Sequence, residues 1–110
     1  MALTVRSIIP PKLASIALTS EYLAAEKTIV DQFTVTNNGG GVIALNVHVV
    51  PSAGSPIVGN RVVNGRLVAP GETFILGEVI GQVIEAGSAI WCSVTAAGTV
   101  VLFASGRVIS

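Results

Sequence analysis

The sequence predicts an all-β fold: a single antiparallel β-sandwich of about 7–8 strands, jelly-roll or immunoglobulin-like, with an extended N-terminal arm. Segments of alternating apolar and polar residues fill most of the 110 positions, and Gly, Pro, Ser and Asn separate them at short intervals. No segment has the length of a helical crossover between parallel strands. One domain is expected, because a chain of this size buries roughly two-thirds of its unfolded surface.

The N-terminal part is expected to divide at residue 12. Residues 1–12 form an arm or edge strand, because Pro10-Pro11 cannot extend a hydrogen-bonded ladder, and residues 13–110 form the sandwich domain. Leu13–Thr19 alternates, which predicts a strand whose Ile16 and Leu18 face the core. Ser20–Lys27 has helix-forming residues but is too short for a stable helix, so a turn or a single helical turn is expected.

Thr28–Pro51 predicts two long strands joined in a hairpin by Asn37–Gly41, where glycines tolerate positive φ. The first strand should point alternate residues into the core, namely Ile29, Asp31, Phe33 and Val35. The second strand should do the same with Ile43, Leu45, Val47 and Val49. His48 would then lie on the outer face, and truncation of Phe33 to Ala would cost roughly 3–5 kcal/mol.

The second half of the chain predicts further strands separated by turns. Residues 51–60 are expected to form a surface loop, and Arg61–Ala69 one continuous strand rather than a hairpin turning at Asn64-Gly65. Gly77–Ile84 has helical spacing, typical of a helical turn that plugs one end of the sandwich. The other expected elements are a turn at Pro70–Glu72 and strands at Thr73–Leu76, Ser88–Ala96 and Thr99–Ile109. The last two strands should bury Ile90, Cys92, Val94, Val100, Leu102 and Ala104.

Charge is scarce: charged residues make up 11% of the chain, whereas about 25% is usual. Six basic residues balance six acidic ones, so there is no net field to hold nucleic acid. A surface with so few charges protects a free monomer poorly, which favours a homo-oligomer or another assembly.

No targeting segment is evident. The N-terminus lacks the uninterrupted apolar stretch of a signal peptide, and no apolar run is long enough to span a membrane. Cys92 is the only cysteine, so an intrachain disulfide is excluded. These features predict a chain that is made and folded in a cytosol and does not bind a membrane.

The residues offer no catalytic, cofactor-binding or metal-binding site, which predicts a protein that is not an enzyme. His48 has no partner at useful spacing, Cys92 should be a buried apolar residue, and the acidic residues should be solvated at turns and strand ends. Asp31 is the exception on the core face: it either lies near the strand end in water or pairs with an arginine such as Arg66 or Arg107.

Possible interface residues lie on the N-terminal arm and on the outer faces of the last two strands. The arm could add to a neighbouring sheet, and Trp91 is a large outward aromatic residue that could anchor a contact. The candidates are Val5, Ile8, Ile9, Trp91, Val101 and Phe103.

Five segments occur in the order KLASIALTSEYL, TIVDQFTVTNNGGG, VHVVPSAGS, RLVAPGETFILGEVIGQVIEAGSAIW and SGRVI. This pattern covers nearly the whole chain and resembles a group of small bacteriophage virion proteins. The chain has Gly87-Ser88 where that group often has a Gly-Asp pair. The resemblance implies a non-enzymatic structural protein of the virion that is synthesised in the host cytoplasm.

The function expected from this resemblance is a capsid decoration or cement protein. Its partners would be the major capsid protein or other virion proteins, and it would bind no cofactor and no small-molecule substrate. Removal of Met1–Pro11 is expected to leave a folded domain that no longer binds particles. A neck, collar or tail appendage protein is the alternative of the same class, and a carbohydrate-binding adhesion module that uses Trp91 is the alternative of another class.

Overall fold

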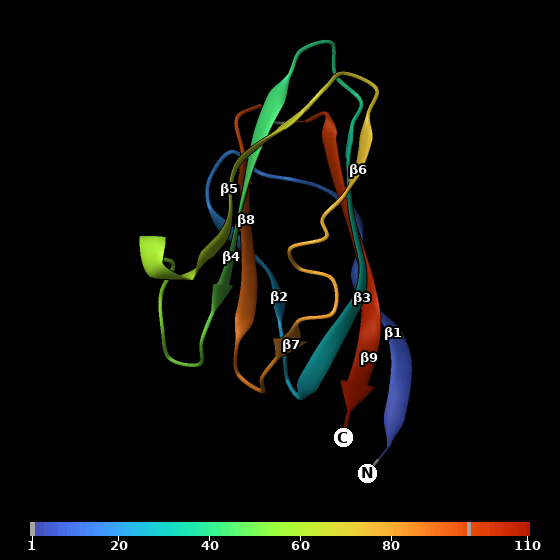
Figure 1. Cartoon of the computed structure of the whole chain (residues 1–110), viewed down its shortest axis with the longest axis vertical. Helices are drawn as coiled ribbons and strands as arrows, with labels where there is room; N and C mark the ends of the chain where they lie inside the picture. Colours follow the sequence, from blue (N-terminus) through green and yellow to red (C-terminus); the bar gives the residue numbers. More distant parts are fainter. Residues whose placement is uncertain (1, 97) are drawn as a thin grey trace.

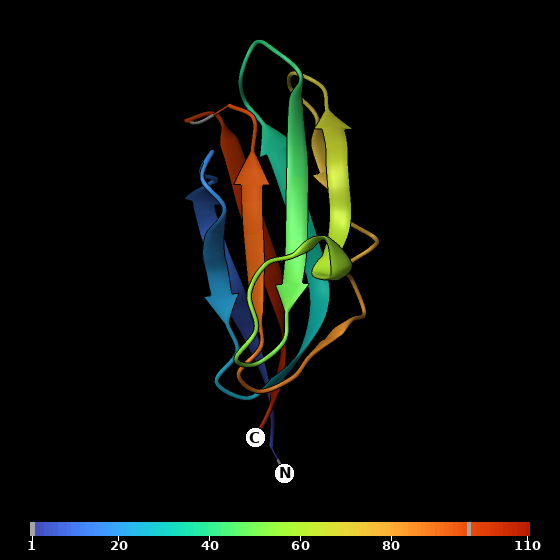
Figure 2. The same cartoon turned by 90° about the vertical axis from the view of Figure 1, so that its left-hand side faces the viewer.

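The computed structural model describes residues 2–96 and 98–110. This part of the chain forms two antiparallel sheets that pack face to face (Figure 1), so the all-β expectation is confirmed. The five-stranded sheet contains β1 (Leu3–Leu13), β9 (Val100–Ile109), β3 (Lys27–Asn37), β6 (Thr73–Ile75) and β7 (Val83–Ile84). The four-stranded sheet contains, in spatial order, β2 (Thr19–Leu23), β8 (Ala89–Val94), β4 (Ile43–Val50) and β5 (Arg61–Val68) (Figure 2).

The N-terminal segment is the edge strand of the five-stranded sheet and pairs with β9. β1 runs through Pro10-Pro11 to Leu13, and register shifts between Ser7 and Lys12 accommodate the two prolines. The strand expected at Leu13–Thr19 is wrong. Residues 14–18 connect β1 to β2, and Ile16 is 59% exposed there rather than buried.

The turn or helical turn expected at Ser20–Lys27 is also wrong, because Thr19–Leu23 is strand β2. β2 pairs with β8, and Tyr22 packs against the core. The hydroxyl groups of Tyr22 and Thr28 lie 2.7 Å apart. Pairing with β8 therefore overrides a local composition that favours helix.

The hairpin expected between β3 and β4 is wrong, because the two strands belong to different sheets. Asn37 holds the loop that crosses between them. Its buried side chain donates to the carbonyls of Gly41 (2.8 Å) and Val68 (3.0 Å), and it accepts from the Gly39 amide (2.9 Å). The positive φ angles expected at the three glycines of this loop are absent. Crossing between sheets lets the apolar faces of the two strands oppose each other across the core.

A register shift in β3 changes which residues face the core. The shift lies between Val30 and Gln32, so Val30 is fully buried while Asp31 and Ile29 are half-buried. The expected inward placement of Ile29 and Asp31 is therefore wrong. Asp31 instead forms an ion pair with Arg107, with 2.9 Å between its carboxylate oxygen and a guanidinium nitrogen. Of the two alternatives that the sequence left open, pairing with an arginine is therefore the one observed.

The remaining elements follow the prediction more closely. Residues 51–60 form a loop that ends in the short 3-10 turn η1 (Val58–Asn60), and β5 is one strand with Gly65 at φ 65° within it. Residues 77–82 form turns without a helix beside β3, where the Gly81 amide donates to the Val30 carbonyl. Leu76 and Val79 of this region are fully buried.

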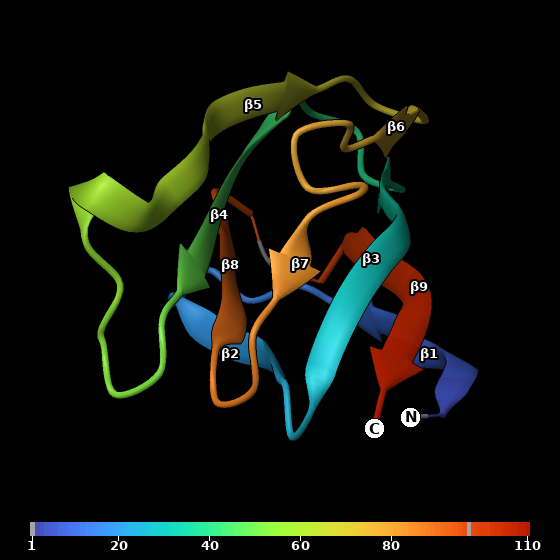
Figure 3. The same ribbon diagram turned by 60° about the horizontal axis from the view of Figure 1, so that its bottom comes forward.

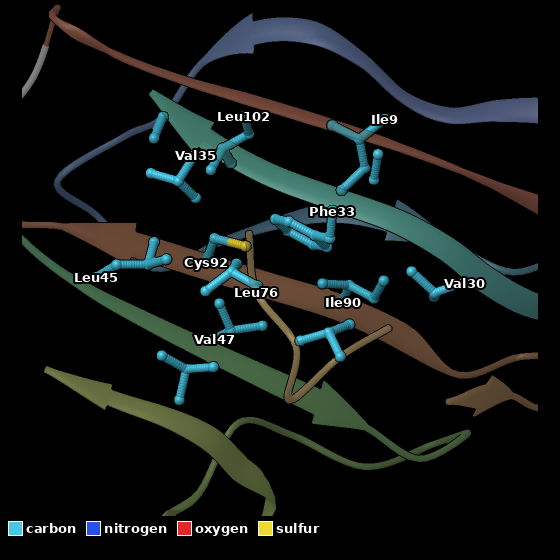
Figure 4. Close-up of a cluster of buried hydrophobic side chains, with 14 of the residues drawn as sticks. Ile9, Val30, Phe33, Val35, Leu45, Val47, Leu76, Ile90, Cys92 and Leu102 are labelled. Atoms are coloured by element: carbon cyan, nitrogen blue, oxygen red, sulfur yellow. The ribbon is translucent and has the colours of Figure 1, made fainter. Parts of the chain in front are cut away.

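The core lies between the sheets, with Phe33 near its centre (Figure 4). The expected inward residues of β8 and β9 are buried, as are those of β4 except Val49, which is half-buried against the core. The described residues contain nine strands rather than seven or eight. β2 takes the place of the strand expected at Leu13–Thr19, and β7 is an additional strand at the end of the segment where a helical turn was expected.

Candidate interaction surfaces

The residues described by the structure contain no group of three or more His, Cys, Asp and Glu side chains that could hold a metal ion. No pocket is found in this part of the chain either.

His48 is buried at 4% exposure, although the sequence predicted an exposed residue. Its position in β4 is outward, beside Trp91 of β8, but the loop at 51–60 covers it. Asn60 fixes this loop: its side-chain oxygen lies 2.9 Å from His48 Nδ1 and accepts from the Ile57 amide, and its amide group donates to Ser55. His48 is therefore a buried residue that is hydrogen-bonded to Asn60 and helps to hold the loop.

Cys92 is fully buried in the core, as the sequence predicted. Burial, and secondarily the nearby Glu21 carboxylate, raises the pKa of the Cys92 thiol. A thiol with a raised pKa is a poor nucleophile at neutral pH, so Cys92 acts as a core residue.

The acidic residues were predicted to be solvated, but the side chain of Glu21 is only 1% exposed. It lies at a register shift of β2, and Lys12 Nζ of β1 is 2.6 Å from its carboxylate, although the carboxylate makes no well-aligned hydrogen bond. This ion pair joins the edge strands of the two sheets. No pattern in the sequence marks Glu21 as buried, since the shift cannot be seen in the residue types.

The expected interface residues do not form one surface. Trp91 lies half-buried on the outer side of the four-stranded sheet, between Ser20 of β2 and His48 of β4. Val101 and Phe103 lie on the outer side of the other sheet, since their neighbours in β9 are the buried ones. The three outward side chains of the last two strands, Trp91, Val101 and Phe103, therefore lie on opposite faces of the sandwich.

The three interface candidates on β1 also differ in where their side chains lie. Val5 is 77% exposed on the outer side of the sheet. Ile8 and Ile9 are both buried, at 5% and 0% exposure, because the register shift after Ser7 turns two consecutive side chains inward. These two isoleucines belong to the core rather than to the surface.

The outer face of the five-stranded sheet carries a broad set of exposed apolar side chains, which we call the apolar face. Its strand pairings place these side chains on one side of β1, β3, β6, β7 and β9. The exposed members are Leu3, Val5, Leu13, Ile75, Val83 and Phe103. The Asp31–Arg107 ion pair crosses this face, so its two charges neutralise each other. The sequence identified only Val5, Val101 and Phe103 because strand pairing brings in the others.

The outer face of the four-stranded sheet is more polar. It carries Ser20, Asn46 and Ser93 beside Trp91 and the covered His48. Asn46 accepts from the Gly65 amide at 2.8 Å. Leu23 and Leu67 are exposed there, but they lie on the two opposite edge strands of this sheet.

Comparisons with protein-family models, curated proteins and solved structures found no match to this chain. Among the residues that the structure describes, no helix is long and apolar enough to cross a membrane.

Proposed function

We propose that this chain is a structural component of a bacteriophage virion, a decoration or cement protein that binds the head shell through many protein–protein contacts. The observation that carries the proposal is the apolar face, where exposed apolar side chains lie among Thr residues of β3 and β6 and the charges of Asp31 and Arg107 neutralise each other. Such a surface loses little hydration of charge when a partner covers it. The resemblance of the sequence to phage virion proteins supports the same function.

The strand order favours a jelly roll as the finer description of the fold. The pairings β1 with β9, β2 with β8, β3 with β6 and β7, and β4 with β5 are those of one long hairpin wound into two sheets. In this description β6 and β7 count as one interrupted strand. Jelly rolls are frequent among viral capsid domains and lectins, which agrees with an assembly function.

Binding in many copies explains how a small protein can stabilise a shell. Each copy needs only a modest affinity, because repeated contacts on a fixed lattice act together. A rigid sandwich also loses little conformational entropy on binding.

Electron cryo-microscopy of intact particles purified from the phage that encodes this chain tests the proposal. We expect density for the sandwich on the outer surface of the head, repeated at equivalent positions of the shell, with the apolar face against the shell. Density confined to a neck, collar or tail would favour the alternative of an appendage protein. Particles that lack the protein altogether would overturn the virion function.

A further inference from the structure

The open edge of β1 is the least protected sheet edge among the described residues. β1 pairs only with β9 there, and no strand lies beyond it (Figure 3). The other edges are short or irregular: β6 and β7 have three and two residues, β2 has five with a register shift, and β5 contains shifts near Gly65. Short or bulged edges prevent pairing with other chains, so only β1 leaves such pairing open.

Within β1, the features that hinder pairing with another chain lie only in the second half of the strand. Pro10, Pro11 and the two register shifts interrupt the strand after Ser7. Leu3–Ser7 is regular and contains no proline, and Arg6 is its only charged residue. This segment therefore keeps the geometry of a strand that can receive a neighbour.

The backbone groups of alternate residues in this segment point away from β9. Ala2 and Ser110 exchange two backbone hydrogen bonds, of 3.0 and 2.9 Å. In a regular antiparallel pair such exchanges recur at every second residue, so Thr4 and Arg6 bond to β9. The amide and carbonyl groups of Leu3, Val5 and Ser7 consequently face the open edge.

We propose that a second copy of this chain pairs antiparallel with β1 across a twofold axis at Val5. Val5 then lies opposite Val5 of the second copy, and Leu3 lies opposite Ser7 of the second copy. All the open backbone groups of this segment are satisfied, with about six hydrogen bonds between the copies. A twofold axis makes one such edge its own complement, so that a second copy satisfies all of these groups at once.

Charge and side-chain placement agree with this pairing. The chain has a formal net charge of +0, so two copies do not repel each other as a whole. Arg6 lies opposite Thr4 of the second copy, so the two arginines are not opposite each other. Leu3 and Val5 are 58% and 77% exposed on the apolar face, which becomes continuous across the pair.

Sedimentation of the full chain over a wide concentration range tests this inference, which does not depend on a virion function. We expect a monomer–dimer equilibrium whose dissociation constant rises by about tenfold or more in Val5→Pro. Proline removes the open amide of residue 5 but no bond to β9, so the melting temperature should change little. The matched control Val5→Thr keeps the amide and should stay within about threefold of the unchanged chain.

Oxidative crosslinking tests the register and does not depend on the proline variant. Residues in a hydrogen-bonded antiparallel pair lie about 5.5 Å apart between Cα atoms, within the range of a disulfide. Val5→Cys alone should crosslink, and a mixture of Leu3→Cys with Ser7→Cys should crosslink, but neither of the latter alone. A chain that stays monomeric at every concentration, a dimer that loses as much affinity in Val5→Thr as in Val5→Pro, or equal crosslinking at all three positions would overturn the proposal.

Discussion

The outer faces of the two sheets are built from similar alternating strands, but they expose different surfaces. The five-stranded sheet exposes the apolar face, with Phe103 45% exposed near its middle. The four-stranded sheet carries Ser20, Asn46 and Ser93 along its central part, and its central His48 is covered by the loop at 51–60. Its exposed Leu23 and Leu67 lie on the two edge strands, and Ile57 and Val58 are exposed on the covering loop. Within this chain, the outer face of one sheet is therefore partly covered by its own loop, and the outer face of the other sheet stays exposed.

This difference separates residues that stabilise the fold from exposed side chains that contribute little to it. His48, Asn60 and the loop at 51–60 satisfy one another, so their loss should affect folding. The apolar face contributes little to the fold, since its exposed side chains have few partners in the chain. The predictions below test this division.

Deletion of residues 1–11 is expected to have the largest effect on stability, whereas the sequence alone predicted that a folded domain would remain. It removes Ile8 and Ile9 from the core, and truncation of a buried isoleucine alone costs about 2–5 kcal/mol. The loss of β1 also uncovers β9, so the chain should fail to fold cooperatively. Circular dichroism during thermal unfolding measures this result. A truncated chain with native cooperative unfolding would instead mean that β1 is a detachable arm.

Phe33→Ala and Phe103→Ala compare the inner and outer faces of the same sheet. Phe33 is fully buried, and its truncation should lower the free energy of unfolding by about 3–5 kcal/mol. Phe103 is 45% exposed, and its truncation should cost less than about 1 kcal/mol. Urea denaturation of both variants measures the difference, and equal losses would mean that the faces are assigned wrongly.

Lys12→Met tests the ion pair that joins the edges of the two sheets. The variant leaves the buried Glu21 carboxylate without its cation, which should cost about 1–3 kcal/mol, less than for a fully buried pair because Lys12 is partly exposed. The exposed pair Lys27–Glu85 provides the control, and Lys27→Met should change stability by about 0.5 kcal/mol or less. Similar losses in both variants, measured by chemical denaturation, would contradict the special role of the buried pair.

Asn60→Ala tests the covering of the four-stranded sheet. It removes the hydrogen bonds that hold the loop to His48, which should cost about 1–2 kcal/mol and expose the imidazole. Asn64→Ala is the control, because its exposed side chain accepts only from Arg61 and its loss should cost about 0.5 kcal/mol or less. Denaturation gives the stabilities, and reaction of His48 with a histidine-modifying reagent gives its exposure. An unreactive His48 in Asn60→Ala would show that other residues cover it.

The sequence was sufficient for the fold class and for the inward faces of the last two strands. Alternate residues of 90–94 and 100–109 are buried as expected, among them Cys92 and Leu102. The continuous β5 was also predicted, because arms on either side of Asn64-Gly65 would be too short to bury a face.

The sequence could not determine which strands share a sheet. Alternation reports which residues point the same way, but β3 and β4 have the same pattern whether they form a hairpin or cross the core. Register shifts at Ile8, Glu21 and Asp31 caused further errors, since each moves a side chain to the other face without a change in residue type. The apolar face was missed because strand pairing cannot be seen in the sequence: Ile75 and Val83 join this face only through their pairing with β3.

The most direct test of the account is the binding of two glutamate variants to particles that lack the protein. Phe103→Glu places a charge on the apolar face, and Leu67→Glu places one on the outer side of the four-stranded sheet at 65% exposure. Co-sedimentation with particles should show binding weakened by about tenfold or more for Phe103→Glu and nearly unchanged for Leu67→Glu. Full binding by Phe103→Glu, or a loss confined to Leu67→Glu, would contradict the assignment of the apolar face as the interaction surface.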